Sequence, residues 1–213
     1  MRVPTARAKR TSRPEKRLRA ADLHDDAPLR RGVPSRRALP AAFVAPFQLH
    51  AFETELGWMA ALGRDGKLVQ LMIGCDSPAE AIGRLNADWL AAAKESRWCT
   101  SLVKQLRAYA AGSVVSFADV AVENRDRTPF QIRVLECCRK IAWGGTLSYG
   151  ELASLAGRNG AARAVGNVMA GNRCPLVIPC HRVVHGDGRI GRFSAPQGAP
   201  MKRRLLALET VGT

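Results

Sequence analysis

The first forty residues of the chain cannot form a hydrophobic core, and this confines the fold to the remainder of the sequence. They hold twelve basic and four acidic residues, a net charge of +8, and no aromatic residue. A segment with little hydrophobic surface and much charge cannot bury enough to offset the entropy lost on ordering. We therefore predict a disordered basic arm over residues 1–41 and a fold that begins near residue 42, where the aromatic residues begin.

Length and hydrophobic patterning set the broad class. The chain of 213 residues is long enough for one domain or two small ones, at roughly 100–200 residues each. It holds no run of about 18 apolar residues, which excludes a transmembrane helix. No apolar stretch follows the basic N-terminus, which excludes a secretory signal. We expect a cytoplasmic protein, associated with the nucleoid if bacterial, with no membrane partner.

The cysteine pattern bears on metal and redox chemistry. The six cysteines, at positions 75, 99, 137, 138, 174 and 180, form no Cys-x-x-Cys pair. This spacing argues against a local zinc site, so no metal is predicted, and a reducing compartment argues against disulfides. One of these thiols is therefore a candidate for chemistry, although a small buried hydrophobic residue is the alternative for each.

The charge balance favours a polyanionic partner. The whole chain has 33 Lys and Arg against 18 Asp and Glu, for a net charge of +15. Since the arm holds +8 of this, the remaining +7 belongs to the part predicted to fold. A basic body together with a basic arm points to nucleic acid. The alternative is a surface whose charge only keeps the protein in solution.

Residues 42–125 have the pattern of a small α/β domain. Two apolar runs flank Asp65-Gly66, a dipeptide that favours the tight turn of a β-hairpin. Ser77-Pro78-Ala79-Glu80 matches a capping box and opens one helix through Leu90. A second amphipathic helix is predicted to end at Gly112. We expect a small antiparallel sheet covered by these helices.

Residues 126–213 are predicted to form a mostly α-helical domain. One helical face starts at Phe130, and a capping box at residues 148–151 opens a second helix that ends at Gly157. A third helix follows over residues 161–170. Two short helices joined by a tight glycine-containing turn form a helix-turn-helix pattern. Arg163 lies in the N-terminal part of the second of these two helices, the part that enters a DNA groove in such motifs.

The residues with the clearest chemical character are Pro179-Cys180-His181-Arg182-Val183. An apolar run at residues 176–178, which we predict to be a strand, leads to a bend at the proline. A free thiol is only a few per cent thiolate at neutral pH, and neighbouring imidazole and guanidinium groups favour the thiolate. Neighbours in sequence need not touch, so a core cysteine beside a surface histidine remains the alternative.

This segment resembles the active-site signature of the O6-alkylguanine-DNA alkyltransferases, also called methylated-DNA–protein-cysteine methyltransferases. Further motifs match in order, at residues 128–131, 148–152, 162–166, 171–172 and 205–209. The resemblance covers residues 128–209 strongly and 53–125 weakly, and the latter includes Leu106-x-x-Tyr109-x-x-Gly112. It implies a ribonuclease-H-like α/β domain followed by a winged-helix-like domain with a helix-turn-helix. It also implies a suicide enzyme that repairs double-stranded DNA once per molecule, without cofactor or obligate protein partner.

The resemblance assigns roles to individual residues. Cys180 would attack the alkyl carbon on guanine O6, and also that of O4-methylthymine, and keep the alkyl group. His181 would take the thiol proton through a water, Glu209 would orient the imidazole, and Asn172 would brace the turn before the cysteine. Tyr149 would help rotate the base out of the duplex and donate a proton to the leaving guanine. The structural alternatives are a helix-end carboxylate for Glu209, a C-cap residue for Asn172 and a core aromatic for Tyr149.

The resemblance also implies a DNA interface and an alkyl pocket. Arg163 would fill the space that the flipped base leaves, with an exposed charge as its alternative. The other predicted DNA contacts are Gln131, Gly150, Arg158 and Arg182. The pocket would be lined by Pro175, Phe193 and Ser194. Where the family has Gly-x-Tyr-x-Gly-Gly, this chain has Phe193 in place of the tyrosine and lacks the paired glycine, so its range of alkyl groups is left open.

Two other classes compete with alkyl transfer. A non-catalytic protein that binds alkylated DNA and flags it for another pathway would lack the reactive cysteine, so Cys180 favours chemistry. A cysteine hydrolase would need an oxyanion hole, and no hydrolase signature is present.

Overall fold

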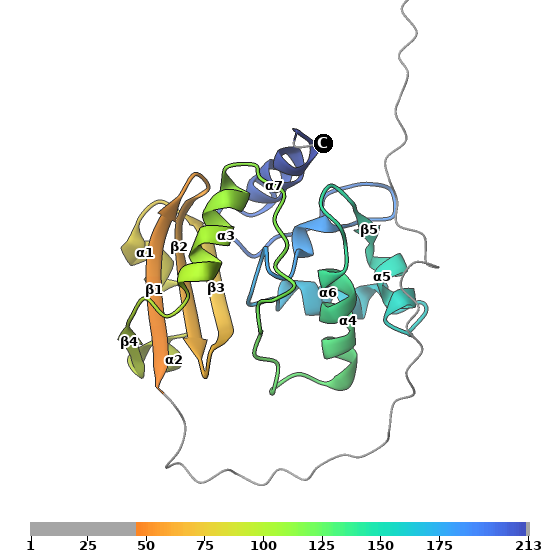
Figure 1. Ribbon diagram of the computed structural model, residues 1–213. Coiled ribbons are helices and arrows are strands. Elements are labelled where there is room, and N and C mark those ends of the chain that lie inside the picture. Colours follow the sequence, from red (N-terminus) through yellow and green to blue (C-terminus); the bar gives the residue numbers. More distant parts are fainter. Residues whose placement is uncertain (1–45, 212–213) are drawn as a thin grey trace, which may run out of the picture.

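The computed structural model describes residues 46–211, so the predicted basic arm lies outside the described residues. An α/β part built from strands β1 to β4 and helices α1 to α3 lies beside a helical part that contains α4 to α7 (Figure 1). None of the described helices is long and apolar enough to span a membrane.

The α/β part is built on a four-stranded mixed sheet with strand order β3-β2-β1-β4. Strands β1 (Phe47–Thr54), β2 (Gly57–Arg64) and β3 (Lys67–Cys75) form an antiparallel meander. The predicted hairpin is confirmed, with Asp65 and Gly66 at φ values of 52° and 71°, as its tight turn requires. The expectation of a purely antiparallel sheet is wrong, because the short edge strand β4 (Ala93–Glu95) runs parallel to β1.

The helix predicted from Ser77 to Leu90 is two helices. Ser77 caps α1 (Pro78–Gly83) by accepting a hydrogen bond from Glu80 N at 3.1 Å, which is one half of the predicted capping box. The Glu80 carboxylate accepts from Asp76 N at 2.9 Å instead of from Ser77 N. The helix is then interrupted, because the Asn86 side chain starts a new helix, α2 (Ala87–Ala91), by accepting a hydrogen bond from Trp89 N at 3.0 Å. The Asn86 N–H in turn donates to the side chain of Gln70 on β3 at 2.9 Å.

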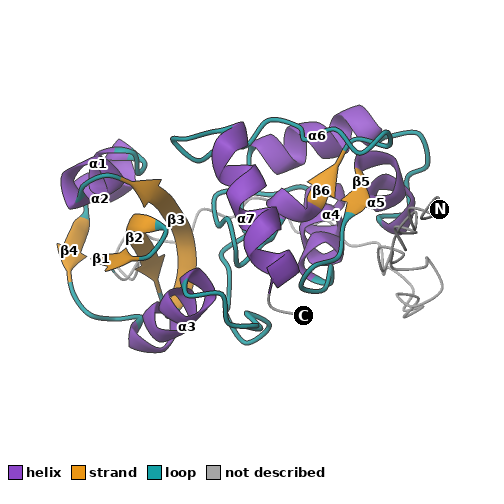
Figure 2. Ribbon diagram, turned by 90° about the horizontal axis from the view of Figure 1, so that it is seen from above, coloured by secondary structure: helices purple, strands orange, loops and turns teal. Residues whose placement is uncertain are grey.

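Helices cover both faces of the sheet. Helices α1 and α2 lie on one face and α3 (Thr100–Ala110) lies on the other (Figure 2). The core under α3 continues into the helical part as one buried cluster, while a smaller cluster lies under α1 and α2. The two parts of the molecule therefore share hydrophobic core.

The helical part begins with two capping boxes, of which the one at Ser148 was predicted and is confirmed. Thr128 and Gln131 form a capping box on α4 (Pro129–Arg139), and Ser148 and Glu151 form one on α5 (Tyr149–Leu155). A turn with Gly157 at φ 77° and Gly160 at φ 76° joins α5 to α6 (Ala162–Ala170). These two packed helices are the predicted helix-turn-helix pair. The chain ends in α7 (Ala199–Val211).

The apolar run before Cys180 is not a strand. Leu176 has a φ of 68°, and the Ile178 N–H donates to Cys174 O at 2.9 Å, so the run is folded into turns. It leads into η3, a 3-10 helix over Cys180–Arg182, and only then into β6 (Val183–Val184), which pairs with β5 (Leu147–Ser148). Apolar composition alone therefore misled the prediction, because these side chains are buried without sheet pairing.

The outer edge of β3 joins the two parts. Leu68 exchanges backbone hydrogen bonds with the connecting segment, accepting from Glu123 N and donating to Ala121 O, both at 2.8 Å. Further along the same edge, Leu71 N donates to Arg173 O at 2.8 Å. A sheet edge that would otherwise offer unpaired groups is thereby covered by the chain itself.

Candidate active site

Cys180 opens η3 and is almost completely buried, with 4% of its surface exposed. Its Sγ accepts a hydrogen bond from Asn172 Nδ2 at 3.0 Å. Burial raises the pKa of the Cys180 thiol, and the Asn172 hydrogen bond and the charge of Lys202 act in the opposite direction. Burial therefore favours the thiol in the resting state, and Asn172 and Lys202 lower the cost of forming the thiolate.

Asn172 holds the turn that carries the cysteine. Besides the sulfur, its Nδ2 donates to Ile178 O at 2.8 Å, and its Oδ1 accepts from Cys174 N at 3.1 Å. The residue follows Gly171, the C-cap of α6, so the helix end and the reactive turn are joined through one buried amide. The predicted bracing contact is thus present in the geometry.

His181 is fully buried and paired with Glu209 from α7, with Nε2 at 2.8 Å from Oε1. An ionised carboxylate can only accept, so Nε2 carries the hydrogen and Nδ1 has the free lone pair. Nδ1 is buried and has no hydrogen-bond partner among the described residues. Burial lowers the pKa of His181, although the carboxylate of Glu209 acts to raise it. The lowered pKa favours the neutral imidazole.

Glu209 is a buried carboxylate that accepts hydrogen bonds from four residues. Arg182 donates to both of its oxygens, at 2.9 and 2.8 Å, and Gly144 N donates to Oε2 at 3.2 Å. The Tyr109 hydroxyl and His181 both donate to Oε1. Burial opposes the charge of this carboxyl, yet the hydrogen bonds from His181 and Arg182 hold the pKa of Glu209 well below its usual range.

The prediction that Arg182 contacts DNA is wrong. The side chain is buried, and besides its two bonds to Glu209 its Nη1 donates to Ile141 O at 2.6 Å. The guanidinium therefore faces inward, where it neutralises the buried carboxylate. Sequence adjacency to the reactive cysteine gave no sign of this direction.

Tyr149 begins α5 beside Lys202, the His185 ring and a loop. Its ring lies 5.9 Å from Lys202 Nζ and 5.3 Å from the His185 ring. A Cβ at position 191 would lie 2.5 Å from its hydroxyl, so the glycine lets the loop approach closely. Burial raises the pKa of Tyr149, so its phenol keeps its proton at neutral pH.

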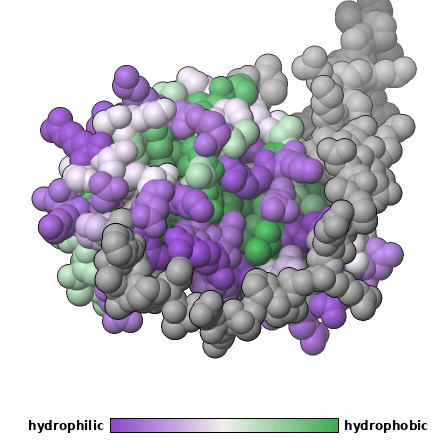
Figure 3. All heavy atoms as spheres, turned by 60° about the horizontal axis from the view of Figure 1, so that its bottom comes forward, coloured by the Kyte–Doolittle hydropathy of each residue, from purple (hydrophilic) through white to green (hydrophobic). Residues whose placement is uncertain are grey.

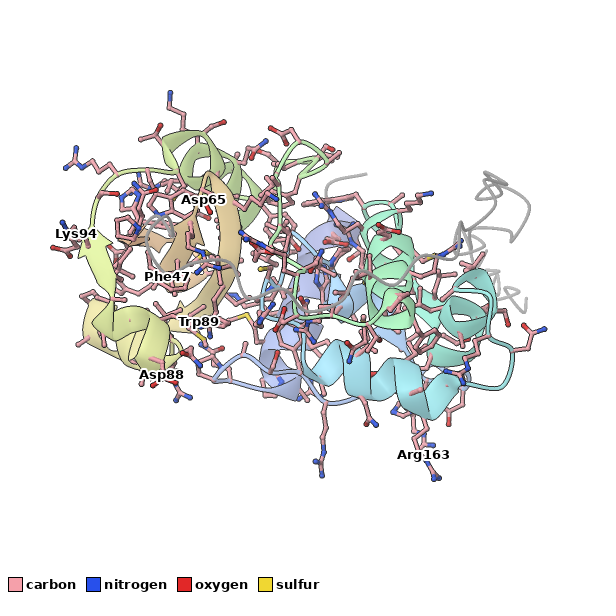
Figure 4. All side chains as sticks on the ribbon, turned by 90° about the horizontal axis from the view of Figure 1, so that it is seen from below. Phe47, Asp65, Asp88, Trp89, Lys94 and Arg163 are labelled. Atoms are coloured by element: carbon pink, nitrogen blue, oxygen red, sulfur yellow. The ribbon has the colours of Figure 1, made fainter. Side chains whose placement is uncertain are left out.

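The remaining predicted DNA contacts lie on helices α4, α5 and α6 and on the turn between α5 and α6. Arg163 is exposed and projects from the N-terminal turn of α6, as Figure 4 shows. Arg158 is exposed in the turn before it and lies over the Phe130 ring at 5.3 Å. Gln131 and Gly150 lie in the first turns of α4 and α5, and the Gln131 side chain accepts from Thr128 N at 2.9 Å. On the face seen in Figure 3, hydrophilic residues cover most of the described surface, with smaller hydrophobic areas between them.

The predicted pocket residues differ in their surroundings. Pro175 is buried beside Cys174, Phe193 is half-buried and packs against the main core, and Ser194 is exposed. The loop that carries the last two is attached to the α/β part by Gln197 Nε2, which donates to Gly74 O at 3.2 Å.

Two buried residues at the site were not predicted. Lys202 is completely buried, donates to Val183 O and has its pKa lowered by burial. Tyr109 reaches the Glu209–His181 pair from α3. The sequence motif Leu106-x-x-Tyr109-x-x-Gly112 belongs to the family resemblance but predicts no function for the Tyr109 hydroxyl. Lys202 is followed by two arginines in α7, a pattern typical of a solvent-exposed helix face.

The geometry defines a class of protein with two features. A buried cysteine accepts a hydrogen bond from an asparagine and is followed in sequence by a histidine paired with a glutamate. The same part of the chain has a pair of helices with exposed arginines. The family model described as "6-O-methylguanine DNA methyltransferase, DNA binding domain" matches residues 129–211. The methylated-DNA–protein-cysteine methyltransferase of Mycolicibacterium paratuberculosis is 35% identical over 157 residues, which are 74% of this chain and 88% of the relative.

Solved structures agree with this comparison. The O6-methylguanine methyltransferase of Mycobacterium tuberculosis has a TM-score of 0.66 at 31% identity, covering 78% of this chain and 94% of that one. The structure of OGT from the same organism in complex with DNA has a TM-score of 0.63 at 29% identity, with the same coverage. The chain belongs to the family of methylated-DNA–protein-cysteine methyltransferases.

Proposed function

We propose that this protein repairs alkylated DNA by direct transfer of the alkyl group from guanine O6 to Cys180, irreversibly and once per molecule. O4-methylthymine is included as a second substrate. The observation that carries the proposal is the Cys180 sulfur, held at 3.0 Å by Asn172 and followed directly by a buried His181–Glu209 pair. Family membership supports the same reaction.

The thiol proton has a defined acceptor in this proposal. His181 Nδ1 has the free lone pair, because Nε2 donates to Glu209. A water between Sγ and Nδ1 would pass the proton from the thiol to the imidazole. The thiolate then attacks the alkyl carbon, the carbon–oxygen bond breaks with its electrons moving into the guanine, and a thioether remains on the protein.

Tyr149 would complete the proton balance and assist base flipping. Its protonated phenol would donate to the guanine as the alkyl group leaves. The base must leave the duplex to reach a thiol that is only 4% exposed. Arg163 would occupy the space left in the stack, while Gln131, Gly150 and Arg158 would contact the backbone of double-stranded DNA.

Further parts of the proposal concern the pocket, the fold and the location. Pro175, Phe193 and Ser194 would line the alkyl pocket, and the altered loop would set its size. The α/β domain would be ribonuclease-H-like over residues 42–125, and residues 126–213 would form a winged-helix-like domain. The cytoplasm, and the nucleoid if the source is bacterial, would be its location, since its substrate is DNA.

The test is intact-protein mass spectrometry after incubation with O6-methylguanine duplex and with unmethylated duplex. One methyl addition is expected with the methylated duplex only, and fragmentation of the peptide that contains Cys174 and Cys180 should place it on Cys180. Cys180→Ser should abolish the addition and keep DNA binding, because an alcohol of much higher pKa replaces the thiol. Cys137→Ser, at a half-buried thiol of α4, is the matched control and should react normally.

Two results would contradict this assignment. Methyl found on Cys174 would place the nucleophile elsewhere. Tight binding of methylated duplex with no mass change would instead identify a non-catalytic protein that flags lesions.

A further inference from the structure

A buried phenol from the α/β part reaches the acid–imidazole pair of the helical part. Tyr109 on α3 has no exposed surface, and its ring packs edge-on against Trp143 with centroids 5.1 Å apart. Its hydroxyl lies 2.7 Å from Glu209 Oε1 and 3.3 Å from His181 Nε2. These partners are 100 and 72 residues away in sequence, so the contact depends on the packing of the two parts.

The direction of these hydrogen bonds follows from the charges. Glu209 is ionised and can only accept, so the Tyr109 hydroxyl and His181 Nε2 both donate to the same oxygen, Oε1. Burial strongly raises the pKa of Tyr109, so the phenol stays protonated and remains a donor. Arg182 Nη2 also donates to Oε1, at 2.8 Å, so three donors share one acceptor atom, and of these three the phenol is the one that carries no formal charge in any state of the site near neutral pH.

We propose that Tyr109 is a positioning residue that sets the basicity of His181 by competing for this oxygen. The hydrogen bond from Tyr109 takes up part of the negative charge on Oε1 and weakens the pull of the carboxylate on the imidazole N–H. The imidazole is thereby kept neutral, with Nδ1 available for a proton. The inference rests on the proposed function only in taking the Cys180 thiol as the source of that proton.

The other charged groups around His181 give the effect a definite sign. The described groups that face it are Glu209 and Lys202 from α7, Arg182 from η3 and Tyr109 from α3, and Cys180 and Cys138 lie close to Lys202. Burial and the two cations disfavour the imidazolium, and Glu209 favours it. Removing the donor that moderates Glu209 must therefore raise the pKa of His181.

Tyr109→Phe in the full chain tests this with the ring packing preserved. The titration of His181 is followed by NMR of 15N-histidine protein, with His181→Asn for assignment. We expect the His181 midpoint to move to higher pH than in the wild type, with the neutral ring still protonated on Nε2. The acid limb of the pH–rate profile for reaction of Cys180 with free O6-benzylguanine should move in the same direction.

Phe117→Leu is the matched control. Its ring packs on Tyr109 with centroids 6.0 Å apart, and a phenyl ring has no hydrogen-bond donor to offer Glu209. It should perturb packing while leaving the histidine midpoint and the acid limb at their wild-type pH. An unmoved or lower midpoint in folded Tyr109→Phe, or a uniform rate loss with an unmoved limb, would overturn the proposal.

A second variant works without removing the phenol. The chain has two tyrosines, so in a Tyr149→Phe background fluorotyrosine labels Tyr109 alone. The more acidic phenol is a stronger donor and should move the His181 midpoint to lower pH, and a shift to higher pH would contradict the proposal. The NMR titration needs no alkyl transfer. A protein that fails to transfer the alkyl group would refute the proposed function, and the His181 midpoints of the wild type and the variants would still decide this inference.

Discussion

At the scale of single residues, the site is organised around one buried carboxylate. Glu209 accepts from Arg182 and His181 on η3, from the backbone at Gly144 and from Tyr109 on α3. A carboxylate with five donor groups from four residues around it can remain ionised without solvent, and it fixes the tautomer of the imidazole beside it. We therefore expect the same residue to support both the proposed reaction and the fold.

Glu209→Gln should strongly destabilise the protein near neutral pH. The substitution leaves the Arg182 guanidinium buried without its counter-charge, which costs about 3–5 kcal/mol when one partner of a buried pair is lost. The pKa of Glu209 is lowered in the folded state, so its contribution is present above the carboxyl's ordinary value of 4.5 and is lost as the pH falls below it. Urea denaturation at pH 7 and pH 4 should show a smaller pH difference for the variant than for the wild type.

The exposed carboxylate of Glu136 gives the control. Glu136→Gln should leave the free energy of unfolding at pH 7 within about 0.5 kcal/mol of the wild type, as surface substitutions usually do. Equal losses for the two variants would show that Glu209 has no special part in stability.

At the scale of elements, the loop that carries Asn172 is clamped by the α/β part. Leu71 N on β3 donates to Arg173 O at 2.8 Å, and the Arg173 guanidinium makes two bonds of 2.8 Å to Asp126. The same guanidinium lies 5.1 Å from the ring of Trp89, which stacks on Phe47 with centroids 5.9 Å apart (Figure 4). The position of the bracing asparagine is thus fixed by contacts from a different part of the chain.

Arg163→Ala should separate base flipping from chemistry. The exposed side chain lies at the start of α6, in the helix pair proposed to bind DNA. Repair of O6-methylguanine in duplex should slow by at least about tenfold, since extruding a stacked base costs a few kcal/mol. Reaction with free O6-benzylguanine should keep its rate, because no base has to be flipped. Equal losses on both substrates, measured as single-turnover rates, would mean that Arg163 supports the pocket or the fold.

The elements most accurately predicted from sequence are those fixed by local chemistry. The capping box at Ser148 and the Asp65-Gly66 turn depend on residues at most three positions apart. The break at Asn86 was missed because Gln70 of another element supports it. The turns at residues 176–178 were read as a strand because burial, not pairing, explains their apolar side chains.

The site shows the same division between local and distant contacts. Cys180 and His181 are adjacent and recognisable from their motif, whereas Glu209 and Asn172 were placed through the family resemblance. Arg182 is predicted to contact DNA but is buried against Glu209, and the motif around Tyr109 predicts no role for its hydroxyl. Those two depend on contacts that span 27 and 100 residues, which no local pattern encodes.

At the scale of the whole molecule, the charge is divided between the arm and the folded body. Residues 1–40 carry +8 of the total of +15, and the body offers the helix pair with Arg158 and Arg163. Contacts to phosphates are independent of sequence, whereas recognition of the lesion requires a pocket. We therefore expect the arm to supply affinity and the body to supply selectivity.

Deleting residues 1–41 should lower the affinity for methylated duplex and the affinity for unmethylated duplex by a similar factor. Neutralised phosphates release counterions, and log affinity falls with log salt by about 0.9 per phosphate contact on duplex DNA, so the truncated protein should have a shallower slope. The check is a salt titration of binding by fluorescence anisotropy for both proteins on both duplexes. Reaction with free O6-benzylguanine should not change, because Cys180 and its partners Asn172, His181 and Glu209 all lie in the helical part. A full salt slope after deletion would show that the arm does not contact DNA, and loss of the free-base reaction would show that the fold begins before residue 42.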